Sequence, residues 1–358
     1  MTGIRGIAAL WVMLYHAQQG AGTTFNLPLL AKVPDLRSGW HGVDLFFMLS
    51  GFILMYAHAR DFIVIQKENT LRFARLRFAR VYPLNAVVLS LIAILVAFQP
   101  GFVAWARTSE PSDYSWQAFA RTLFLANRWF LPGRGDWNQP VWSLSLEVLG
   151  YLMFPLLAFC ALRITRKWLL FGVALLSLFG SLAILAIRGV AFDNSIGRVA
   201  FVRMITCFVT GIAIFRLWTL MAESHRKWAG WFAAVSVAGI LILGIVPLYG
   251  DLLYNFFFAS LLYGLAFQQG IVNRLLASRA AVFLGEISFP LYLSHVVPLL
   301  WLRYFLLSNP AKYSTIEKSL ALVGWAVGCI LMATLLHRYV EEPFHALGRR
   351  WAGARMTE

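Results

Sequence analysis

The chain of 358 residues is 60% hydrophobic and only 13% charged, and its mean hydropathy is +0.69. About a quarter of the residues in soluble globular proteins are charged, so this composition excludes an ordinary soluble fold and indicates a polytopic membrane protein. The net charge of +15 is typical of a membrane protein whose loops lie against anionic lipid.

Apolar runs near 20 residues follow one another along the whole sequence, and each is long enough to cross a hydrocarbon core of ~30 Å. They cover residues 3–21, 39–58, 83–104, 140–160, 168–188, 199–220, 229–247, 249–270, 281–302 and 319–339. We therefore expect an all-α transmembrane bundle of about ten helices. The first run lacks the cleavage site of a signal peptide, so we expect it to be retained. We predict one membrane domain over residues 1–345 and a short basic cytoplasmic tail over 346–358.

The placement of lysine and arginine predicts how the bundle is oriented. If the N-terminus is cytoplasmic, the basic loops around residues 60–80, 163–167, 216–227, 274–279 and 349–355 all face inward. The opposite loops carry fewer basic residues, and the positive-inside rule therefore places both termini in the cytoplasm.

The first apolar run holds two polar residues, Arg5 and His16, eleven residues apart. On a helix this spacing returns to nearly the same face, with the two side chains roughly 16 Å apart along the axis. Because a polar group in hydrocarbon is costly unless it lines a cavity or has a partner, both residues are candidates for function.

A second basic segment, LRFARLRFARVYP, precedes the third apolar run. Arg72, Arg75, Arg77 and Arg80 form a cationic band on a helix there, with aromatic residues such as Tyr82 between them. Guanidinium groups bind phosphate well, so the band is expected to bind either a phosphorylated cytoplasmic ligand or lipid headgroups. A nucleic acid partner is not expected for a band at membrane level.

Four ionisable side chains from four runs, His16, Asp44, Glu147 and His295, fall at one depth in the outer half of the predicted bundle. This convergence favours a shared polar cavity. A neutral histidine held by a carboxylate can remove a proton from a hydroxyl, so His16 is the proposed base and Glu147 its orienting partner. Asp44 either joins this catalytic group or bonds the backbone near a helix start.

Cofactor chemistry finds little support in the sequence. Cys160, Cys207 and Cys329 all lie in apolar runs without metal-ligand spacing, so no metal site is expected. No glycine-rich phosphate loop occurs, which removes support for ATP hydrolysis and hydride transfer.

Several sequence blocks together resemble the membrane acyltransferase-3 family. They are TGIRGIAALWVMLYH, GVDLFFMLSGFIL, the RxxR pair followed by VYPL, VWSLSLEVLGYLMFP, FLGEISFPLYLSH and RYVEEPF. Members are O-acetyltransferases that modify bacterial surface polysaccharides, lipopolysaccharide and some small molecules. The resemblance implies an acyltransferase of the bacterial inner membrane, with acetyl-CoA as acyl donor and a glycan hydroxyl as acceptor.

The resemblance also assigns roles to residues. It implies that Arg5 and His16 form the family's arginine-histidine motif, with His16 essential. It implies that Arg77 and Arg80, the RxxR pair, help to bind acyl-CoA, and we place Tyr82 beside them.

Trp142 and Ser143 match a W-S-L-x-x-E block that ends at Glu147. With His295 they are our candidates for the acceptor side. Val148 stands where a second acidic residue is frequent, so the resemblance supports no carboxylate pair there.

The expected mechanism combines these residues. The nucleotide end of acetyl-CoA rests on Arg77 and Arg80, its pantetheine arm runs along the stripe from Arg5 to His16, and a sugar hydroxyl attacks from the periplasmic side. Direct transfer and transient acylation of the protein both remain open. Two other functions also remain open: a transporter or flippase of a lipid-linked sugar, and a structural component of a polysaccharide export complex.

Overall fold

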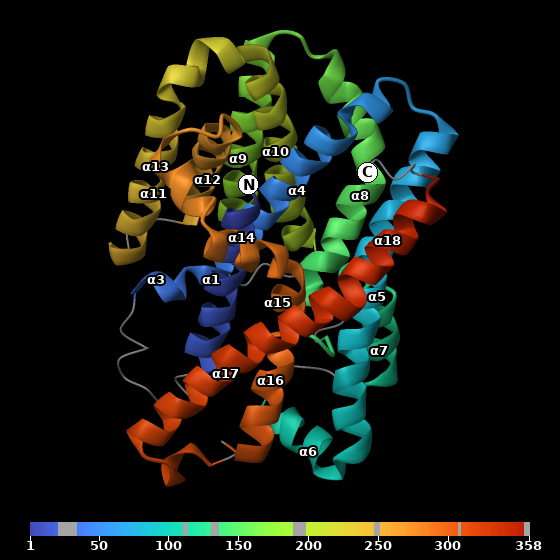
Figure 1. The fold of residues 1–358 in the computed structure, drawn as a ribbon, viewed down its shortest axis with the longest axis vertical. Helices are drawn as coiled ribbons and strands as arrows, with labels where there is room; N and C mark the ends of the chain where they lie inside the picture. The colour runs from blue at the N-terminus through green and yellow to red at the C-terminus, as the bar shows by residue number, and fades with distance from the viewer. Residues whose placement is uncertain are drawn as a thin grey trace. The chain divides into compact units, whose positions relative to one another are not determined.

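The computed structural model describes residues 1–20, 34–109, 114–129, 136–188, 198–246, 251–306 and 309–353. Within these ranges every regular element is a helix (Figure 1). Seven of the helices in the described part are long and apolar enough to cross a membrane, and two shorter apolar helices accompany them. The expected helical membrane bundle is confirmed, while the number of about ten spans stays a prediction.

Most of the expected apolar runs correspond to one helix each. The longer elements are α1 (Thr2–Gly20), α4 (Gly42–His58), α5 (Lys67–Phe98), α6 (Pro100–Ser109), α8 (Val141–Arg163), α9 (Lys167–Arg188), α10 (Arg198–His225), α11 (Ala229–Ile245), α12 (Asp251–Ala266), α17 (Thr315–Leu336) and α18 (Glu342–Trp351). Shorter helices are α3 (Pro34–Arg37), α7 (Trp116–Leu123), α13 (Gly270–Leu276), α14 (Arg279–Glu286), α15 (Ser288–Ser294) and α16 (Val296–Trp301). Two π-helical segments, η6 (Leu302–Leu306) and η8 (His337–Glu341), follow α16 and α17.

The chain divides into two compact units, each built from segments far apart in the sequence. The first unit comprises Met1–Ala8, Ser38–Leu71 and Leu146–Gly285. The second comprises Ala9–Arg37, Arg72–Ser145 and Glu286–Glu358. The predicted tail begins inside α18 of the second unit, and its residues 354–358 lie outside the described part of the chain.

Two glycines allow a close approach of α4 and α10 in the first unit. A Cβ atom on Gly51 would lie 2.1 Å from the carbonyl oxygen of Phe208, and one on Gly211 would lie 2.0 Å from that of Met48. Any side chain at either position would therefore push the two backbones apart. Small residues at such crossings are common between membrane helices, where close packing replaces the hydrophobic effect as the source of association.

The expected span 281–302 is not one helix. It is divided into α14, α15 and α16, and His295 stands between the last two. Pro298 explains this break, because it has no N–H to donate to the carbonyl of Ser294 one turn earlier. The third expected run also differs: α5 begins at Lys67 and ends before Pro100, where α6 starts.

The last helices of the second unit run on from one another. Helix α17, the π-helical segment η8 and α18 follow in sequence as one long rod in Figure 1. Helix α17 packs against α15. Helix α18 packs closely on α5 at Gly348. A Cβ atom at this position would lie 2.4 Å from the Cβ of Ala79, so only glycine allows this approach. This packing brings the RYVEEPF segment to the arginine-rich half of α5.

Candidate active site

The centre of the candidate site is a histidine pair, His16 of α1 and His295 between α15 and α16. The Nε2 atom of His295 lies 3.2 Å from Nδ1 of His16, and the ring centroids are 4.9 Å apart. His295 is fully buried, while His16 is partly buried. Both residues were expected at one depth, and the second unit brings their rings into contact.

Backbone carbonyls determine which nitrogen of each ring carries the proton. Nδ1 of His295 faces the carbonyl oxygens of Tyr292 at 2.8 Å and Leu291 at 3.2 Å, so it donates and leaves the lone pair on Nε2. Nδ1 of His16 faces this lone pair and the carbonyl oxygen of Val12 at 2.9 Å. Since both neighbours only accept, His16 holds its proton on Nδ1 and its lone pair on Nε2. Nε2 of His16 is therefore the proton acceptor of the pair.

A buried hydroxyl pair adjoins His295. The hydroxyls of Ser143 and Tyr292 lie 2.6 Å apart, and both reach the carbonyl oxygen of Pro140, at 3.1 and 3.2 Å. Trp142, the neighbour of Ser143 at the start of α8, is half-buried. Tyr292 thus connects two of the residues predicted for the acceptor side: its hydroxyl contacts Ser143, and its backbone carbonyl contacts His295.

Two buried polar atoms near this group make no hydrogen bond within the described residues. One is Oδ1 of Asn138, whose amide nitrogen donates to the carbonyl oxygen of Leu293 at 2.8 Å. The other is Oγ of Ser294. Buried polar groups are almost always paired, so these two atoms are candidates for contact with a substrate.

The segment before α8 is fixed by Asp136. Its carboxylate accepts hydrogen bonds from Asn127 at 2.7 Å and Arg128 at 2.8 Å. Burial raises the pKa of this carboxyl, although Arg128 acts in the opposite direction. The backbone N–H of Arg128 and the indole of Trp129 in turn bond Ser145. The start of α8, with Ser143, is therefore held from outside the helix.

The predicted donor residues Arg77, Arg80 and Tyr82 lie on α5 in the same unit. The guanidinium carbon of Arg80 is 6.0 Å from the ring centroid of Phe289, and Tyr82 stacks on Phe78 at 4.8 Å. These contacts agree with a cationic band interleaved with aromatic rings.

Sequence analysis did not anticipate that α18 contributes to this band. His345 of α18 lies within electrostatic range of Arg77 and Arg80. The buried carboxylate of Glu341 is 2.7 Å from Nδ1 of His337 and 4.0 Å from Nε2 of His345. Glu341 closes the π-helical segment η8, an irregularity that is frequent at functional sites. The RYVEEPF block was the sequence signal for this contribution.

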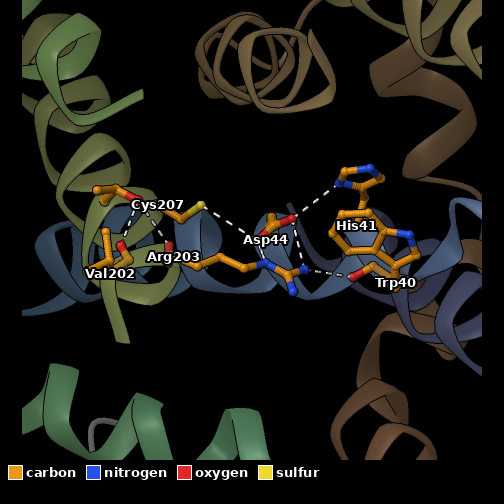
Figure 2. A network of polar contacts seen from close by, with 7 residues as sticks. Trp40, His41, Asp44, Val202, Arg203 and Cys207 are labelled. Atoms are coloured by element: carbon orange, nitrogen blue, oxygen red, sulfur yellow. Dashed lines mark hydrogen bonds and ion pairs between the residues drawn. The ribbon is translucent and has the colours of Figure 1, made fainter. Parts of the chain in front are cut away.

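Asp44 lies in the first unit, in a buried ionic network shown in Figure 2. Its Oδ1 accepts from Nε of Arg203 at 2.5 Å, and its Oδ2 from the terminal nitrogen of Arg203 at 3.0 Å. His41 Nδ1 is 3.3 Å from Oδ2, and Arg203 also donates to the carbonyl of Trp40. Both Asp44 oxygens therefore face the guanidinium fork, a partner 159 residues away that the sequence did not reveal. A catalytic role for Asp44 stays a prediction.

Glu147 and Arg5 also belong to the first unit. Oε1 of Glu147 accepts hydrogen bonds from the hydroxyls of Ser50 and Tyr151, both at 2.7 Å. The orienting role of Glu147 toward His16 stays a prediction. Arg5 lines a cavity at the start of α1. Within the described residues, no three His, Cys, Asp or Glu side chains come together as metal ligands.

Comparison with known proteins identifies the family. A model of the acyltransferase domain matches residues 1–336. Acyltransferase MdmB of Streptomyces mycarofaciens is 28% identical over 382 residues, which cover 98% of this chain and 92% of that protein. O-acetyltransferase OatA of Staphylococcus aureus is 24% identical over 375 residues, which cover 97% of this chain. The chain spans only 57% of the length of OatA.

A third relative, protein 2 in picA locus of Rhizobium radiobacter, is 38% identical over 160 residues, which are 42% of this chain. No solved structure matches the chain. The matches favour an enzyme over the transporter and the structural component that the sequence left open. The chain belongs to the membrane acyltransferase-3 family and is a multi-pass membrane O-acyltransferase.

Proposed function

We propose that this enzyme transfers an acetyl group from cytoplasmic acetyl-CoA to a hydroxyl of a surface polysaccharide or its lipid-linked precursor, with His16 as general base. The observation that carries the proposal is the histidine pair, in which Nδ1 of His16 has two acceptors and Nε2 keeps the lone pair. The name of OatA, an O-acetyltransferase, supports acetyl as the acyl group.

The reaction needs one proton acceptor that later becomes a proton donor. In the proposal, Nε2 of His16 takes the proton of the acceptor hydroxyl as its oxygen bonds to the thioester carbonyl carbon. The carbon–sulfur bond then breaks, and the imidazolium returns the proton to the CoA thiolate. During this step the charged ring of His16 donates from Nδ1 to Val12 and to His295. His295 thus positions the base. We propose separately that Glu147 also orients His16.

The donor approaches along α1. Arg5 and His16 both lie on this helix, and eleven residues at 1.5 Å each separate them by roughly 16 Å. An extended pantetheine arm can follow this stripe, with its thioester at His16. The guanidinium groups of Arg77 and Arg80, beside Tyr82, suit the phosphates at the other end of the donor.

The acceptor side is proposed around Trp142, Ser143 and His295. Within the second unit, a cavity of ≈ 760 Å³ lies between α16 and α17, and its wall includes Trp325, whose indole bonds the carbonyl of His295. Apolar residues such as Phe305 line this cavity, and a polyisoprenoid or acyl chain suits it. This supports a lipid-linked acceptor next to the histidine pair.

We further propose that the enzyme lies in the bacterial inner membrane with both termini in the cytoplasm. The excess of basic residues in loops on the N-terminal side supports this orientation. Donor and acceptor then approach His16 from opposite compartments.

The test is transfer of label from radioactive acetyl-CoA to an acceptor glycan by the purified protein. Wild type should label the glycan, and His16→Ala should abolish labelling while it still inserts and folds, because removing one imidazole leaves a cavity and no unpaired charge. Exposed Lys227→Ala is the matched control. A His16→Ala variant with more than about a tenth of wild-type turnover would contradict the role of His16 as base. Release of labelled acetate without labelled glycan would contradict the proposal that a glycan hydroxyl is the acceptor.

A further inference from the structure

The ion pair of Arg128 and Asp136, in the segment between α7 and α8 of the second unit, is accessible from one end. Nη2 of Arg128 donates to Oδ2 of Asp136 at 2.8 Å. The side chain of Asp136 is 2% exposed, and that of Arg128 is 14% exposed. The carboxylate is therefore sealed inside the unit, whereas part of the guanidinium can be reached from outside.

The buried carboxylate holds Arg128 by one corner and leaves the rest of the guanidinium for a ligand. Oδ1 of Asp136 accepts from the amide of Asn127 at 2.7 Å, so each carboxylate oxygen has a donor. A guanidinium has five N–H donors, and the ion pair uses one of them. The other donors of Arg128 meet no acceptor among the residues that the structure describes. A second edge of the guanidinium is therefore available for a two-point contact with an oxyanion.

The surroundings of the pair carry an excess of positive charge. Arg121 of α7 lies within electrostatic range of Asp136. Two guanidinium groups thus face one carboxyl group, and the sum of their charges is positive whether or not Asp136 is ionised. A cationic group with low solvent exposure attracts anions more strongly than a fully solvated one, because water screens it less.

The segment of Arg128 lies across the start of α8 from the hydroxyl pair of Ser143 and Tyr292. The backbone N–H of Arg128 donates to Oγ of Ser145 at 3.2 Å. Ser143 and Ser145 are two residues apart on α8, so at about 100° per residue their side chains leave nearly opposite faces of the helix. A helix is about 10 Å across, which is about the length of one or two sugar residues. One acceptor glycan can therefore reach both faces.

We propose that Arg128 binds a carboxylate or phosphate group of the acceptor glycan, and that Asp136 is the positioning residue of this arginine. The sugar that carries the reactive hydroxyl lies at Ser143 and Tyr292, and the charged group belongs to the same sugar or to its neighbour. The enzyme thus selects an acidic glycan over a neutral one of the same linkage. The inference rests on the proposed function, which places the acceptor at the start of α8.

The first test varies the charge of the acceptor. The glycan that the wild type labels is compared in three forms: untreated, with its carboxylates reduced to alcohols after carbodiimide activation, and with its phosphates removed by hydrofluoric acid. One of the two treatments should raise KM for the glycan about tenfold or more, with KM for acetyl-CoA unchanged. That treatment identifies the anionic group. If neither treatment changes KM for the glycan, the proposal is wrong.

The second test measures binding of the untreated glycan to the full chain in phosphatidylcholine nanodiscs by calorimetric titration. Arg128→Ala should raise Kd about tenfold, and Arg128→Lys should recover only part of this loss, because Lys makes no two-point contact. Arg128→Ala also leaves a buried carboxylate without its partner. Asp136→Asn combined with Arg128→Ala removes both charges, and should show the same rise in Kd with wild-type thermal unfolding. Exposed Lys312→Ala, on a loop predicted for the same side of the membrane, is the control.

The outcomes separate this site from the proposed function. An unchanged Kd in the double variant overturns the anion site and leaves acyl transfer intact. If the glycan binds through Arg128 as expected but receives no acetyl group, the proposed function fails and the anion site stands. If the wild type does not bind the glycan, both proposals fail.

Discussion

The indole Nε1 of Trp325 donates a hydrogen bond to the backbone carbonyl of His295 at 3.3 Å, and Sγ of Cys329 lies 3.6 Å from the same oxygen. Both donors come from one face of α17. They satisfy a carbonyl at the break between α15 and α16, where Pro298 interrupts the helical hydrogen bonds. Helix α17 thus fixes the backbone that points His295 at His16.

The first prediction concerns His295 as a positioning residue. His295→Ala removes the acceptor that holds Nδ1–H of His16, so kcat should fall about 10²-fold with little change in KM for the donor. His295→Gln returns an acceptor oxygen to the position of Nε2 and should recover much of this loss. A purely structural role would lower thermal stability in both variants and would give no rescue by Gln.

The second prediction concerns the cationic band. Arg77→Ala and Arg80→Ala should each raise KM for acyl-CoA much more than KM for the acceptor, and Lys should restore little, because it cannot bind phosphate bidentately. Lys67→Ala, at the exposed start of the same helix and outside the band, is the control. Steady-state kinetics with both substrates varied gives the answer. If KM for acyl-CoA is unchanged in both variants, the band binds lipid headgroups and not the donor.

The third prediction concerns the network around Asp44. Arg203→Met leaves a buried carboxylate without its guanidinium partner and should lower the free energy of unfolding by about 3–5 kcal/mol. The double variant Asp44→Asn with Arg203→Met removes both charges and should regain most of the loss. Thermal unfolding in detergent measures both, with exposed Arg274→Met as control. If the double variant is as unstable as the single one, the network is not held by its charges.

The fourth prediction concerns sidedness. Cys160 is the exposed native cysteine of the described chain, so it is first changed to serine. In that background, Glu68→Cys before the cationic band should react with impermeant thiol reagents only from the cytoplasm. Gln117→Cys on α7 should react only from the periplasm. Both positions are exposed. Inside-out vesicles that acylate an acceptor supplied on the cytoplasmic face would refute transfer across the membrane and leave His16 as base.

Much of the fold follows from local sequence. The apolar runs predicted α1, α4, α8, α10 and α11 to within a few residues, because a membrane span of about 20 residues has to be apolar along its length. The interruption at His295 was also visible in principle, since Pro298 follows three residues later. It was missed because the hydropathy of the run 281–302 continues through the break.

The side-chain partners could not be predicted in this way. Depth alone placed His16 and His295 at one level, but their contact at 3.2 Å depends on how α15 packs against α17. Similarly, one prediction for Asp44 was a bond to the backbone near its own helix start, whereas its partner Arg203 lies on α10. Rotation of a helix about its axis decides such pairs, and hydropathy says little about it when a helix is apolar on all sides.

The histidine pair joins residues 279 positions apart, one on α1 and one between α15 and α16. During synthesis, α1 enters the membrane long before α15 and α17 exist. The carbonyl of Val12 on the same helix can accept from Nδ1 of His16 at once, but the second acceptor, Nε2 of His295, is added only when the C-terminal helices have been inserted. In the proposed mechanism, a partly made chain therefore carries His16 without its positioning partner His295, and acyl transfer has to await the C-terminal helices.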